Sequence, residues 1–281
     1  MPLKITNKSA KVRVYIYNLE DEMTKSQYTR FSRKGSWLIA GILFLGAIWQ
    51  LSASLQAQSS NSPLNESDAL LDSYRHVEVA SVSDALEQLT GRKMYLSHKM
   101  QSIFPAKFAG FALTVKLSKD EGNKDPAALG GMLAAIDQGT RNSVWVMVVE
   151  DGADIAGMGG LMGTAMAARG YSGAVIDGGV RDVGQLRKIG FPVYATGIVP
   201  STSVSHYRFA GAEIPVTCDG VEVNPGDIVA ADGDGVVIVP RAKAKEVLAI
   251  AQEMDFKEHS MYSIIEKYKS IQEAVKRFGR L

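Results

Sequence analysis

Hydrophobic and polar positions follow two different periods in the part of the chain after residue 66. Residues 108–117 alternate and are rich in Ala, Val and Thr, and residues 143–149 are a nearly continuous run of β-forming side chains, so both are predicted strands. Between them, residues 126–138 have apolar side chains at helical spacing. A strand, a helix and a second strand in this order favour a parallel crossover in an α/β sheet.

The same two periods continue through the middle of the chain. Helices are predicted at 67–89, as two short segments, and at 161–169 and 183–189. Strands are predicted at 173–176 and 192–196. Together with the first crossover, these segments predict further parallel strands connected by helices.

The last third of the chain changes character twice. Residues 214–240 are β-rich and contain turn signals such as Asn-Pro-Gly at 224–226, so they predict a second, more antiparallel layer. Residues 241–278 carry the apolar faces of two amphipathic helices. The expected fold class is therefore α/β, with a mixed sheet and C-terminal helices.

The N-terminal segment has the pattern of an export signal. Residues 37–49 are apolar and uncharged, and Arg30, Arg33 and Lys34 precede them. A run of this length is shorter than the roughly 20 residues that cross a bilayer as a helix, although residues 51–55 extend it if the segment is not cleaved. A buried core helix is the alternative, but the basic residues end abruptly and a linker-like segment follows, which favours export.

We therefore expect the chain to have three parts. Residues 1–57 are a signal peptide, cleaved after Ala57, or an N-terminal anchor, 58–66 are a linker, and 67–281 form one folded domain. This division predicts a periplasmic or secreted protein, or a protein anchored to the inner membrane by residues 37–55. In either case the membrane is contacted only through the N-terminal segment.

The charge distribution argues against a nucleic-acid partner. Residues 1–57 hold eight of the 31 Lys and Arg residues and three of the 30 acidic residues, so the remainder carries 23 basic and 27 acidic residues. Phosphate binding needs clustered cations, and no Lys and Arg stripe is present in this mildly acidic part. We expect no nucleic acid among the partners.

A glycine-rich stretch at 157–163 follows one predicted strand and opens a predicted helix. Closely spaced glycines let backbone N–H groups approach an anion, and the start of a helix adds partial positive charge. The stretch is not a dinucleotide-binding fingerprint, because no acid at the end of the next strand is expected in the ribose-binding role of that motif. It predicts a carboxylate or phosphate site, with close packing of helix on sheet as the alternative.

A second candidate follows the strand at 173–176. Asp177, Arg181 and Asp182 come at the end of this strand, where ligands of parallel sheets bind. Arg binds a carboxylate through two parallel hydrogen bonds, and Asp binds Mg²⁺ or Mn²⁺, which keep most of their waters. A surface ion pair is the alternative, but the position after a buried strand and near the glycines favours a site.

These residues belong to a longer ordered pattern. It consists of Gly160 and, after 20 intervening residues, Arg181-Asp182, followed by Gly-Phe-Pro-Val-Tyr-Ala at 190–195, Pro-Gly-Asp at 225–227 and Ala-Asp-Gly-Asp-Gly-Val-Val-Ile-Val-Pro at 231–240. Over residues 79–254 the chain resembles the RraA-like family. That family includes 4-hydroxy-4-methyl-2-oxoglutarate aldolases, oxaloacetate decarboxylases, the regulator of ribonuclease activity and proteins misnamed dimethylmenaquinone methyltransferases.

The resemblance implies a layered β/β/α fold of the swivelling-domain type, assembled as homotrimers or dimers of trimers with active sites between subunits. It implies that Arg181 binds the carboxylate or oxo group of the substrate and that Asp182 binds the metal, Mg²⁺ or Mn²⁺. Glu258, or else Glu253, is the candidate for a glutamate that a neighbouring subunit contributes. The backbone expected to bind the remaining carboxylate oxygens is that of Gly159, Gly160, Leu161 and Met162.

One position departs from the family pattern. The aldolases usually have Asp at the position that is Gly160 here. Retro-aldol cleavage needs a base to remove the hydroxyl proton, so loss of this carboxylate affects it most. Decarboxylation of oxaloacetate needs no such base, because a metal ion polarises the oxo group. The substitution therefore favours decarboxylation.

Other polar residues have ordinary explanations. Cys218 is the single cysteine, lies in a strand-like run without a nearby His, and is expected to be a small buried side chain rather than a nucleophile. Asp232 and Asp234 are expected to serve turn formation rather than metal binding. His206 is expected to be a surface or core residue rather than a base.

The first hypothesis is thus an exported, metal-dependent carbon–carbon lyase that acts on a small 2-oxo acid and releases pyruvate. The second is a non-catalytic regulatory or binding protein on the same scaffold, which the intact Arg181-Asp182 pair disfavours. The third is a lyase on another hydroxy or oxo acid, in which Gly160 makes room for a bulkier group.

Overall fold

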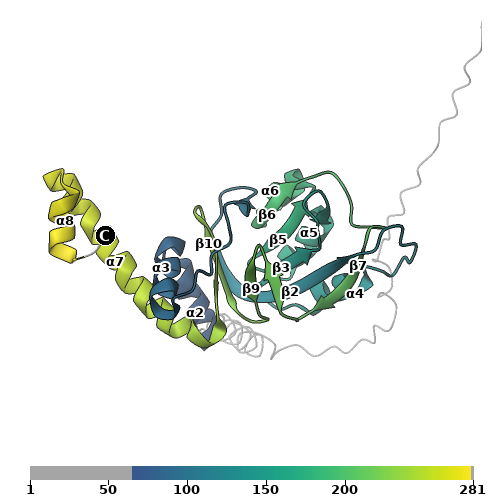
Figure 1. The fold of residues 1–281 in the computed structure, drawn as a ribbon, viewed down its shortest axis with the longest axis horizontal. Helices are drawn as coiled ribbons and strands as arrows, with labels where there is room; N and C mark the ends of the chain where they lie inside the picture. The colour runs from purple at the N-terminus through teal and green to yellow at the C-terminus, as the bar shows by residue number, and fades with distance from the viewer. Residues whose placement is uncertain (1–64, 280–281) are drawn as a thin grey trace, which may run out of the picture. The chain divides into compact units, whose positions relative to one another are not determined.

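The long strand β2, Phe108–Lys119, lies at the centre of the sheet in the computed structural model of the protein, which describes residues 65–279. Parallel to it runs β3, Ser143–Val149, followed by β5, Gly173–Val180, and β6, Val193–Ile198 (Figure 1). The predicted parallel strands are therefore confirmed, and β3 begins and ends at the predicted residues.

Antiparallel strands complete a nine-stranded sheet within residues 65–279. The hairpin of β10, Ile228–Asp232, and β11, Gly235–Val239, pairs with the first half of β2, and β7, Tyr207–Ala212, pairs with its second half. Two short strands also join this sheet: β1, Gln101–Ser102, pairs with β6, and β4, Ala156–Met158, pairs with β5. A separate two-stranded sheet is formed by β8, Val216–Cys218, and β9, Val221–Val223.

The expectation of a second antiparallel layer over 214–240 is correct for the strand direction and wrong for the layer. The β10–β11 hairpin joins the main sheet through β2, and only β8 and β9 form a separate sheet. The reason is the length of β2, whose 12 residues offer a free edge to two antiparallel partners. The sequence did not predict β7, because this strand is stabilised by pairing with a distant segment.

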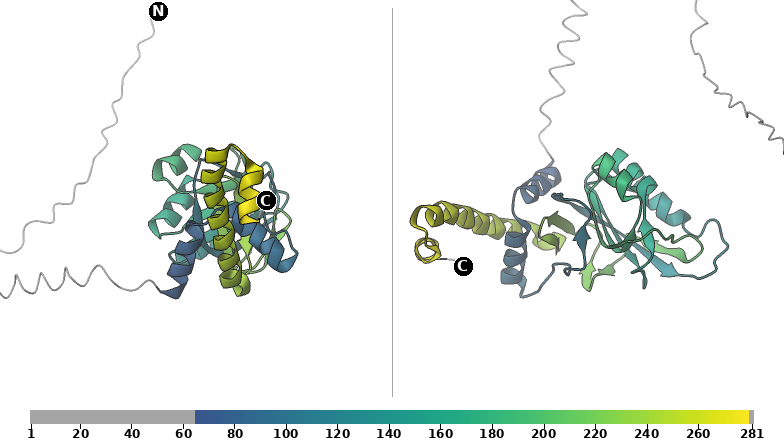
Figure 2. Two further views of the ribbon diagram at one scale, coloured as in Figure 1. Left: turned by 90° about the vertical axis from the view of Figure 1, so that its left-hand side faces the viewer. Right: turned by 90° about the horizontal axis from the view of Figure 1, so that it is seen from above.

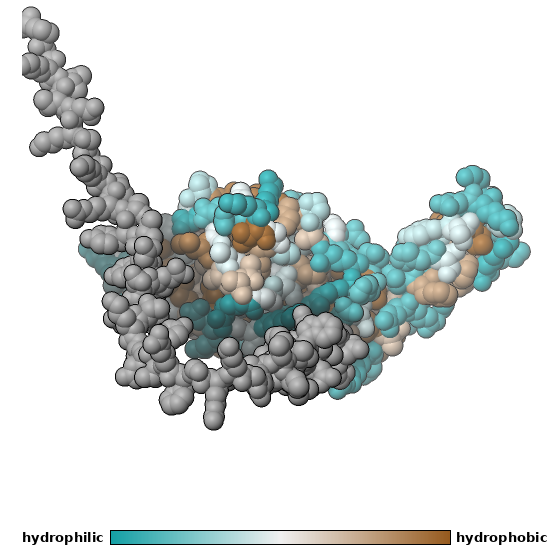
Figure 3. Space-filling model, turned by 180° about the vertical axis from the view of Figure 1, so that it is seen from behind, coloured by the Kyte–Doolittle hydropathy of each residue, from teal (hydrophilic) through white to brown (hydrophobic). Residues whose placement is uncertain are grey.

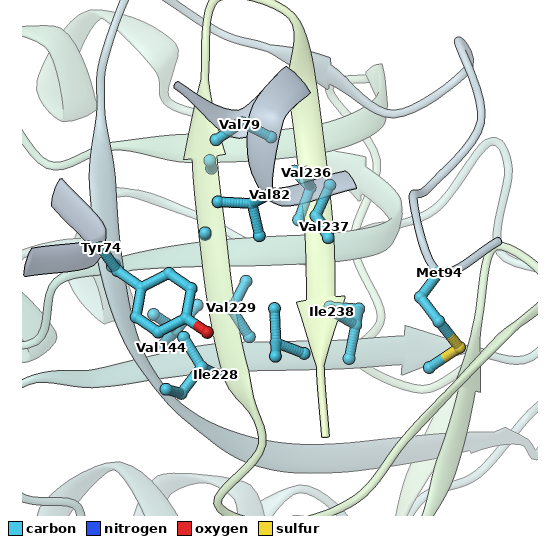
Figure 4. Packing of buried hydrophobic residues seen from close by; sticks show 14 of the residues in the cluster. Tyr74, Val79, Val82, Met94, Val144, Ile228, Val229, Val236, Val237 and Ile238 are labelled. Carbon is cyan, nitrogen blue, oxygen red and sulfur yellow. The ribbon is translucent and has the colours of Figure 1, made fainter. Parts of the chain in front are cut away.

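The side chains of β3 alternate between two hydrophobic cores, as a strand buried on both faces requires. Val144 and Val146 belong to one core, and Trp145 and Met147 belong to the other. The first core also contains Tyr74, Val82 and residues of the β10–β11 hairpin, which Figure 4 shows packed together. The helices of the first core are α2 (Glu66–Arg75), α3 (Val79–Thr90) and α7 (Ala244–Tyr268). The helices of the second core are α4 (Gly130–Gln138), α5 (Gly160–Ala168) and α6 (Val183–Ile189).

The two C-terminal helices extend beyond the sheet, as Figures 1 and 2 show. The first half of α7 packs through Val247 and Ala251, both fully buried, whereas its second half pairs mainly with α8, Ile271–Phe278. Hydrophobic side chains lie at the surface of this pair among hydrophilic ones (Figure 3). The exposed large apolar residues of the pair are Phe256, Tyr262, Tyr268 and Ile271.

The predicted signal or anchor segment and most of the predicted linker lie outside the described residues. Within residues 65–279, no helix combines the length and the apolar character that a membrane span needs.

Asp232, at the end of β10, connects a turn to a helix. Its carboxylate is buried and accepts hydrogen bonds from the backbone N–H of Asp234, at 3.0 Å, and of Val79, at 2.9 Å. The first bond confirms the predicted role in the turn, and the second satisfies a donor at the start of α3 that has no acceptor within the helix. Lys107 lies 3.9 Å away and compensates part of the buried charge.

We predict that Asp232→Ala lowers the free energy of unfolding by about 2–4 kcal/mol, because two backbone donors lose their acceptor in a buried place. Asp234→Ala, in the same turn but exposed, is the matched control and should change it by less than about 0.5 kcal/mol. Urea denaturation followed by circular dichroism measures both. Equal effects of the two substitutions would contradict this role of Asp232.

Candidate active site

A cavity of about 440 Å³ opens where the parallel strands end. Strand β5 ends at Val180, and Arg181 and Asp182 follow at the start of α6. The glycine-rich stretch lies beside them, because β4 pairs with β5 and leads into α5. The lining residues are 123–126, 128–130, 132–133, 156–159, 161–162, 181–182 and 202–205.

Asp182 connects the starts of α5 and α6. Its carboxylate Oδ2 accepts a hydrogen bond from the Gly160 backbone N–H at 3.0 Å, and its carbonyl accepts from Gln185 and Leu186 in the first turn of α6. The residue has a left-handed backbone, with φ of 57°, a conformation that Asp adopts more readily than most residues other than Gly. The side chain is exposed, and within residues 65–279 no donor is bonded to Oδ1.

Arg181 is half-buried beside this carboxylate. One guanidinium nitrogen, Nη1, donates to the Ser201 carbonyl at 3.1 Å, and within the described part of the chain no carboxylate lies within 4.0 Å to form an ion pair. A guanidinium with a single neutral acceptor keeps most of its donors for an anion. Arg181 is therefore suited to bind a carboxylate in the cavity.

Gly159 makes this arrangement possible by having no side chain. A Cβ atom at this position would lie 2.8 Å from Asp182 Oδ2 and 3.1 Å from Arg181 Cγ, closer than atoms of this kind approach. Gly159 thus lets both side chains pass over the start of α5, and its neighbours Leu161 and Met162 line the cavity.

Gly160 lies behind the cavity wall rather than in it. A Cβ atom there would meet Asp182 Cβ at 3.1 Å and Gln185 Cγ at 3.1 Å, so the space next to Gly160 is already filled by α6. The idea that Gly160 makes room for a bulkier substrate group is therefore wrong. The chain nevertheless lacks the carboxylate that the aldolases usually have at this position.

The start of α5 offers further donors. The first N–H groups of a helix have no acceptor within the helix, and that of Gly160 is taken by Asp182. The N–H groups of Leu161 and Met162 remain for an anion, helped by the partial positive charge of the helix start. This arrangement is consistent with the predicted carboxylate site, although the Gly160 N–H is occupied.

Three carboxylates named from the sequence lie away from this cavity. Asp177 accepts from the Asp219 backbone N–H at 2.7 Å and does not line the cavity. Glu258 and Glu253 lie on α7, where Glu258 accepts from the Tyr262 hydroxyl and Glu253 forms an ion pair with Lys257. Because the glutamate was expected from a neighbouring subunit, its role stays a prediction.

The sequence did not predict two loops of the cavity wall, 123–126 and 202–205. They bring Lys124 and the buried Ser203 to the site. The second loop follows β6, whose end lies at the same edge of the sheet as that of β5, and this neighbourhood is a signal that could have indicated it. His206, just beyond, is half-buried and pairs with Glu121 at 2.6 Å, as expected of a residue with a structural role.

The donor set fits a hard cation that retains its waters. Within residues 65–279, no group of three or more His, Cys, Asp or Glu side chains could hold a metal ion. A cation at Asp182 would therefore have at most two such side chains of this chain as ligands. Mg²⁺ is commonly bound through one or two carboxylates and several waters, which such a ligand set satisfies. Cys218 takes no part, because it is fully buried and burial raises the pKa of its thiol.

Comparisons with known proteins identify the family of this chain. The family model described as RraA-like, Aldolase/RraA, matches residues 79–238. Protein DlpA of Legionella pneumophila is 30% identical over 190 residues, which are 66% of this chain and 30% of DlpA, so the chain spans less than a third of that relative. The 4-hydroxy-4-methyl-2-oxoglutarate aldolase of Thermus thermophilus is 31% identical over 97 residues, 34% of this chain and 58% of that protein.

A solved structure supports the same conclusion. Streptomyces coelicolor RraAS2, described as an unusual member of the RNase ES inhibitor RraA protein family, superposes with a TM-score of 0.61 at 26% identity. The match covers 73% of this chain and 98% of RraAS2. Since the family model covers more than half of the sequence and the mixed α/β fold agrees, this chain belongs to the RraA-like family.

Proposed function

We propose that this chain is a divalent-metal-dependent carbon–carbon lyase that acts on a small 2-oxo acid and releases pyruvate. The observation that carries the proposal is the meeting of Arg181, Asp182 and the start of α5 in the lining of one cavity. A positive side chain, a carboxylate for a cation and free backbone donors are together what a 2-oxo carboxylate needs for binding and polarisation. The names of the aldolase relatives support the same reaction class.

Each group then has a distinct part. Arg181 binds the substrate carboxylate, and the backbone N–H groups of Leu161 and Met162 bind its remaining oxygen. Asp182 would hold Mg²⁺ or Mn²⁺ through Oδ1 while Oδ2 stays bonded to Gly160, so the ligand is fixed in place before the cation binds. The bound cation supplies Lewis-acid polarisation of the oxo group.

The lack of a carboxylate at Gly160 favours decarboxylation over retro-aldol cleavage. In oxaloacetate the C3–C4 bond breaks, CO₂ leaves, and the electron pair stays on C3 as the enolate of pyruvate, which then takes a proton from water. No hydroxyl proton has to be removed, so no base is needed at the position of Gly160. Arg181 offsets the negative charge that develops on the oxo oxygen.

We further propose that the active protein is a homotrimer or a dimer of trimers, with Glu258 of a neighbouring copy reaching the cavity. A group of exposed apolar side chains on α7 and α8 supports this assembly, namely Phe256, Tyr262, Tyr268 and Ile271. Contact of this group with a neighbouring copy would bury it, and contact beside the cavity would bring Glu258 near.

The first test compares the wild-type protein with Asp182→Asn. Asn tolerates the left-handed backbone and still accepts the Gly160 hydrogen bond, but it has no charge for a cation. We expect Asp182→Asn to release pyruvate from oxaloacetate with Mg²⁺ about 100-fold or more slowly than the wild type, at the rate that Mg²⁺ gives without protein. EDTA should lower the rate of the wild-type protein in the same way. Asp137→Asn, exposed on α4, is the control.

The same assay with 4-hydroxy-4-methyl-2-oxoglutarate decides between the two reactions. Release from oxaloacetate alone would support decarboxylation, and release from both would show that Gly160 does not prevent aldol cleavage. A folded assembly that is inactive on both substrates would contradict the lyase proposal and favour a regulatory or binding role.

Mixing two inactive variants tests the shared site. Glu258→Gln should lower the rate without changing the oligomeric state, whereas Glu253→Gln, one helical turn earlier and paired with Lys257, should leave the rate unchanged. Co-refolding Asp182→Asn with Glu258→Gln should restore part of the activity, because some interfaces then combine an intact Asp182 with an intact Glu258. A monomer by light scattering, or an absence of rescue, would refute the shared site.

We also propose export, for which residues 37–49 with their preceding basic side chains are the support. The intact mass of protein purified from the cell envelope or medium is the measurement. An N-terminus at Gln58 is expected for a cleaved signal peptide, and retention of residues 37–55 in a membrane fraction is expected for an anchor. A full-length protein confined to the cytoplasm would exclude export.

A further inference from the structure

Two chemically different sets of groups line the cavity that holds Arg181 and Asp182. One set is the guanidinium, the carboxylate and the backbone at the start of α5, as described above. The other set is an apolar wall of hydrophobic side chains at α4, in the first turn of α5 and in the loop after β6. These side chains are Leu129, Met132, Leu133, Leu161, Met162 and Val204.

The exposure of this wall is unusual for leucine and valine. Leu133 is 54% exposed, Leu161 is 89% exposed and Val204 is 58% exposed, although all three line a cavity that leads to charged groups. Exposed apolar side chains gathered around a cavity mark a ligand site more often than chance. The wall is therefore ready to bury apolar surface of a bound molecule.

A second carboxylate would fit this wall poorly. A carboxylate placed against leucine and methionine loses water without gaining a hydrogen bond, which is unfavourable. Lys124 is the other cation of the lining, but it belongs to an exposed part of the loop at 123–126 rather than to the apolar wall. The volume of about 440 Å³ also lies in the range of roughly 300–1,000 Å³ that is common for ligands larger than a four-carbon acid.

We propose that the site takes oxaloacetates that carry an apolar group on C3, with a branched aliphatic or aromatic group against Leu133, Leu161 and Val204. This inference rests on the proposed function, and oxaloacetate is then the unsubstituted member of the substrate class. The 2-oxo carboxylate lies at Arg181 and Asp182. The apolar wall receives the C3 substituent.

Decarboxylation of such a substrate requires no reactant other than water. The C3–C4 bond breaks, the C4 carboxylate leaves as CO₂, and its electron pair stays on C3 as an enolate. Water then delivers a proton to C3, and the product is a longer 2-oxo acid with the same apolar group.

Product binding tests the inference without requiring turnover. Isothermal titration with Mg²⁺ would compare pyruvate, 2-oxo-4-methylpentanoate, phenylpyruvate and 2-oxoglutarate on the full assembled protein. Each buried methylene strengthens binding by about fourfold, so we expect the two apolar acids to bind at least about tenfold more tightly than pyruvate. 2-Oxoglutarate should bind no more tightly than pyruvate.

Leu133→Lys should lower the affinity for 2-oxo-4-methylpentanoate about tenfold, leave that for pyruvate unchanged and raise that for 2-oxoglutarate. Ile198→Lys is the matched control, because Ile198 is 59% exposed and does not line the cavity. Both positions are exposed, so the variants should fold, and circular dichroism and light scattering would verify this.

The outcomes separate this inference from the proposed function. If the wild-type protein does not turn over oxaloacetate but binds the four acids in the expected order of affinity, the lyase proposal is rejected and the apolar site is supported. Turnover with equal affinities for all four acids would keep the lyase and overturn the apolar site. Tighter binding of 2-oxoglutarate that Lys124→Ala abolishes would also overturn it, as would a Leu133→Lys variant that changes only the oligomeric state.

Discussion

The burial of the parallel strands on both faces is the constraint on which the rest of this structure depends. Residues of β3 alternate between two hydrophobic cores, and β5 beside it is similarly buried except at Asp177, so polar and charged groups concentrate where the strands end. The edge where β5 and β6 end is therefore where ligand-binding groups can gather. Arg181 and Asp182 follow β5 at this edge, and α5 begins beside them because β4 pairs with β5.

Within that frame, one hydrogen bond organises the chemistry. The bond between Asp182 Oδ2 and the Gly160 N–H joins two helix starts, with Asp182 in the left-handed conformation. Gly159 and Gly160 at the start of α5 allow this close approach, since a Cβ on Gly159 would lie 2.8 Å from Asp182 Oδ2 and a Cβ on Gly160 would lie 3.1 Å from Asp182 Cβ. The bond fixes a carboxylate beside a guanidinium, which pre-organises the site for an anion and a cation.

The arrangement of apolar surface adds a second level of organisation. Outside the cores, exposed large hydrophobic side chains gather on the C-terminal helix pair and around the cavity, within the residues that the structure describes. A wall that binds an apolar substituent and a rim that contacts a neighbouring copy are compatible, because an assembly that covers the mouth also removes water from the bound group.

The sequence alone determined what local patterns encode. These are the strands β2, β3 and β5, the helices α4, α5 and α6, the glycine-rich start of α5, and the position of Arg181 and Asp182 after a buried strand, since hydrophobic period and strand end are properties of neighbouring residues. Tertiary structure decided that the 228–239 hairpin and β7 extend the same sheet, that loops 123–126 and 202–205 complete the cavity, and that Asp182 bonds Gly160. These features depend on contacts between segments far apart in the chain, and a strand edge or cavity wall leaves no local signal of which distant segment will complete it.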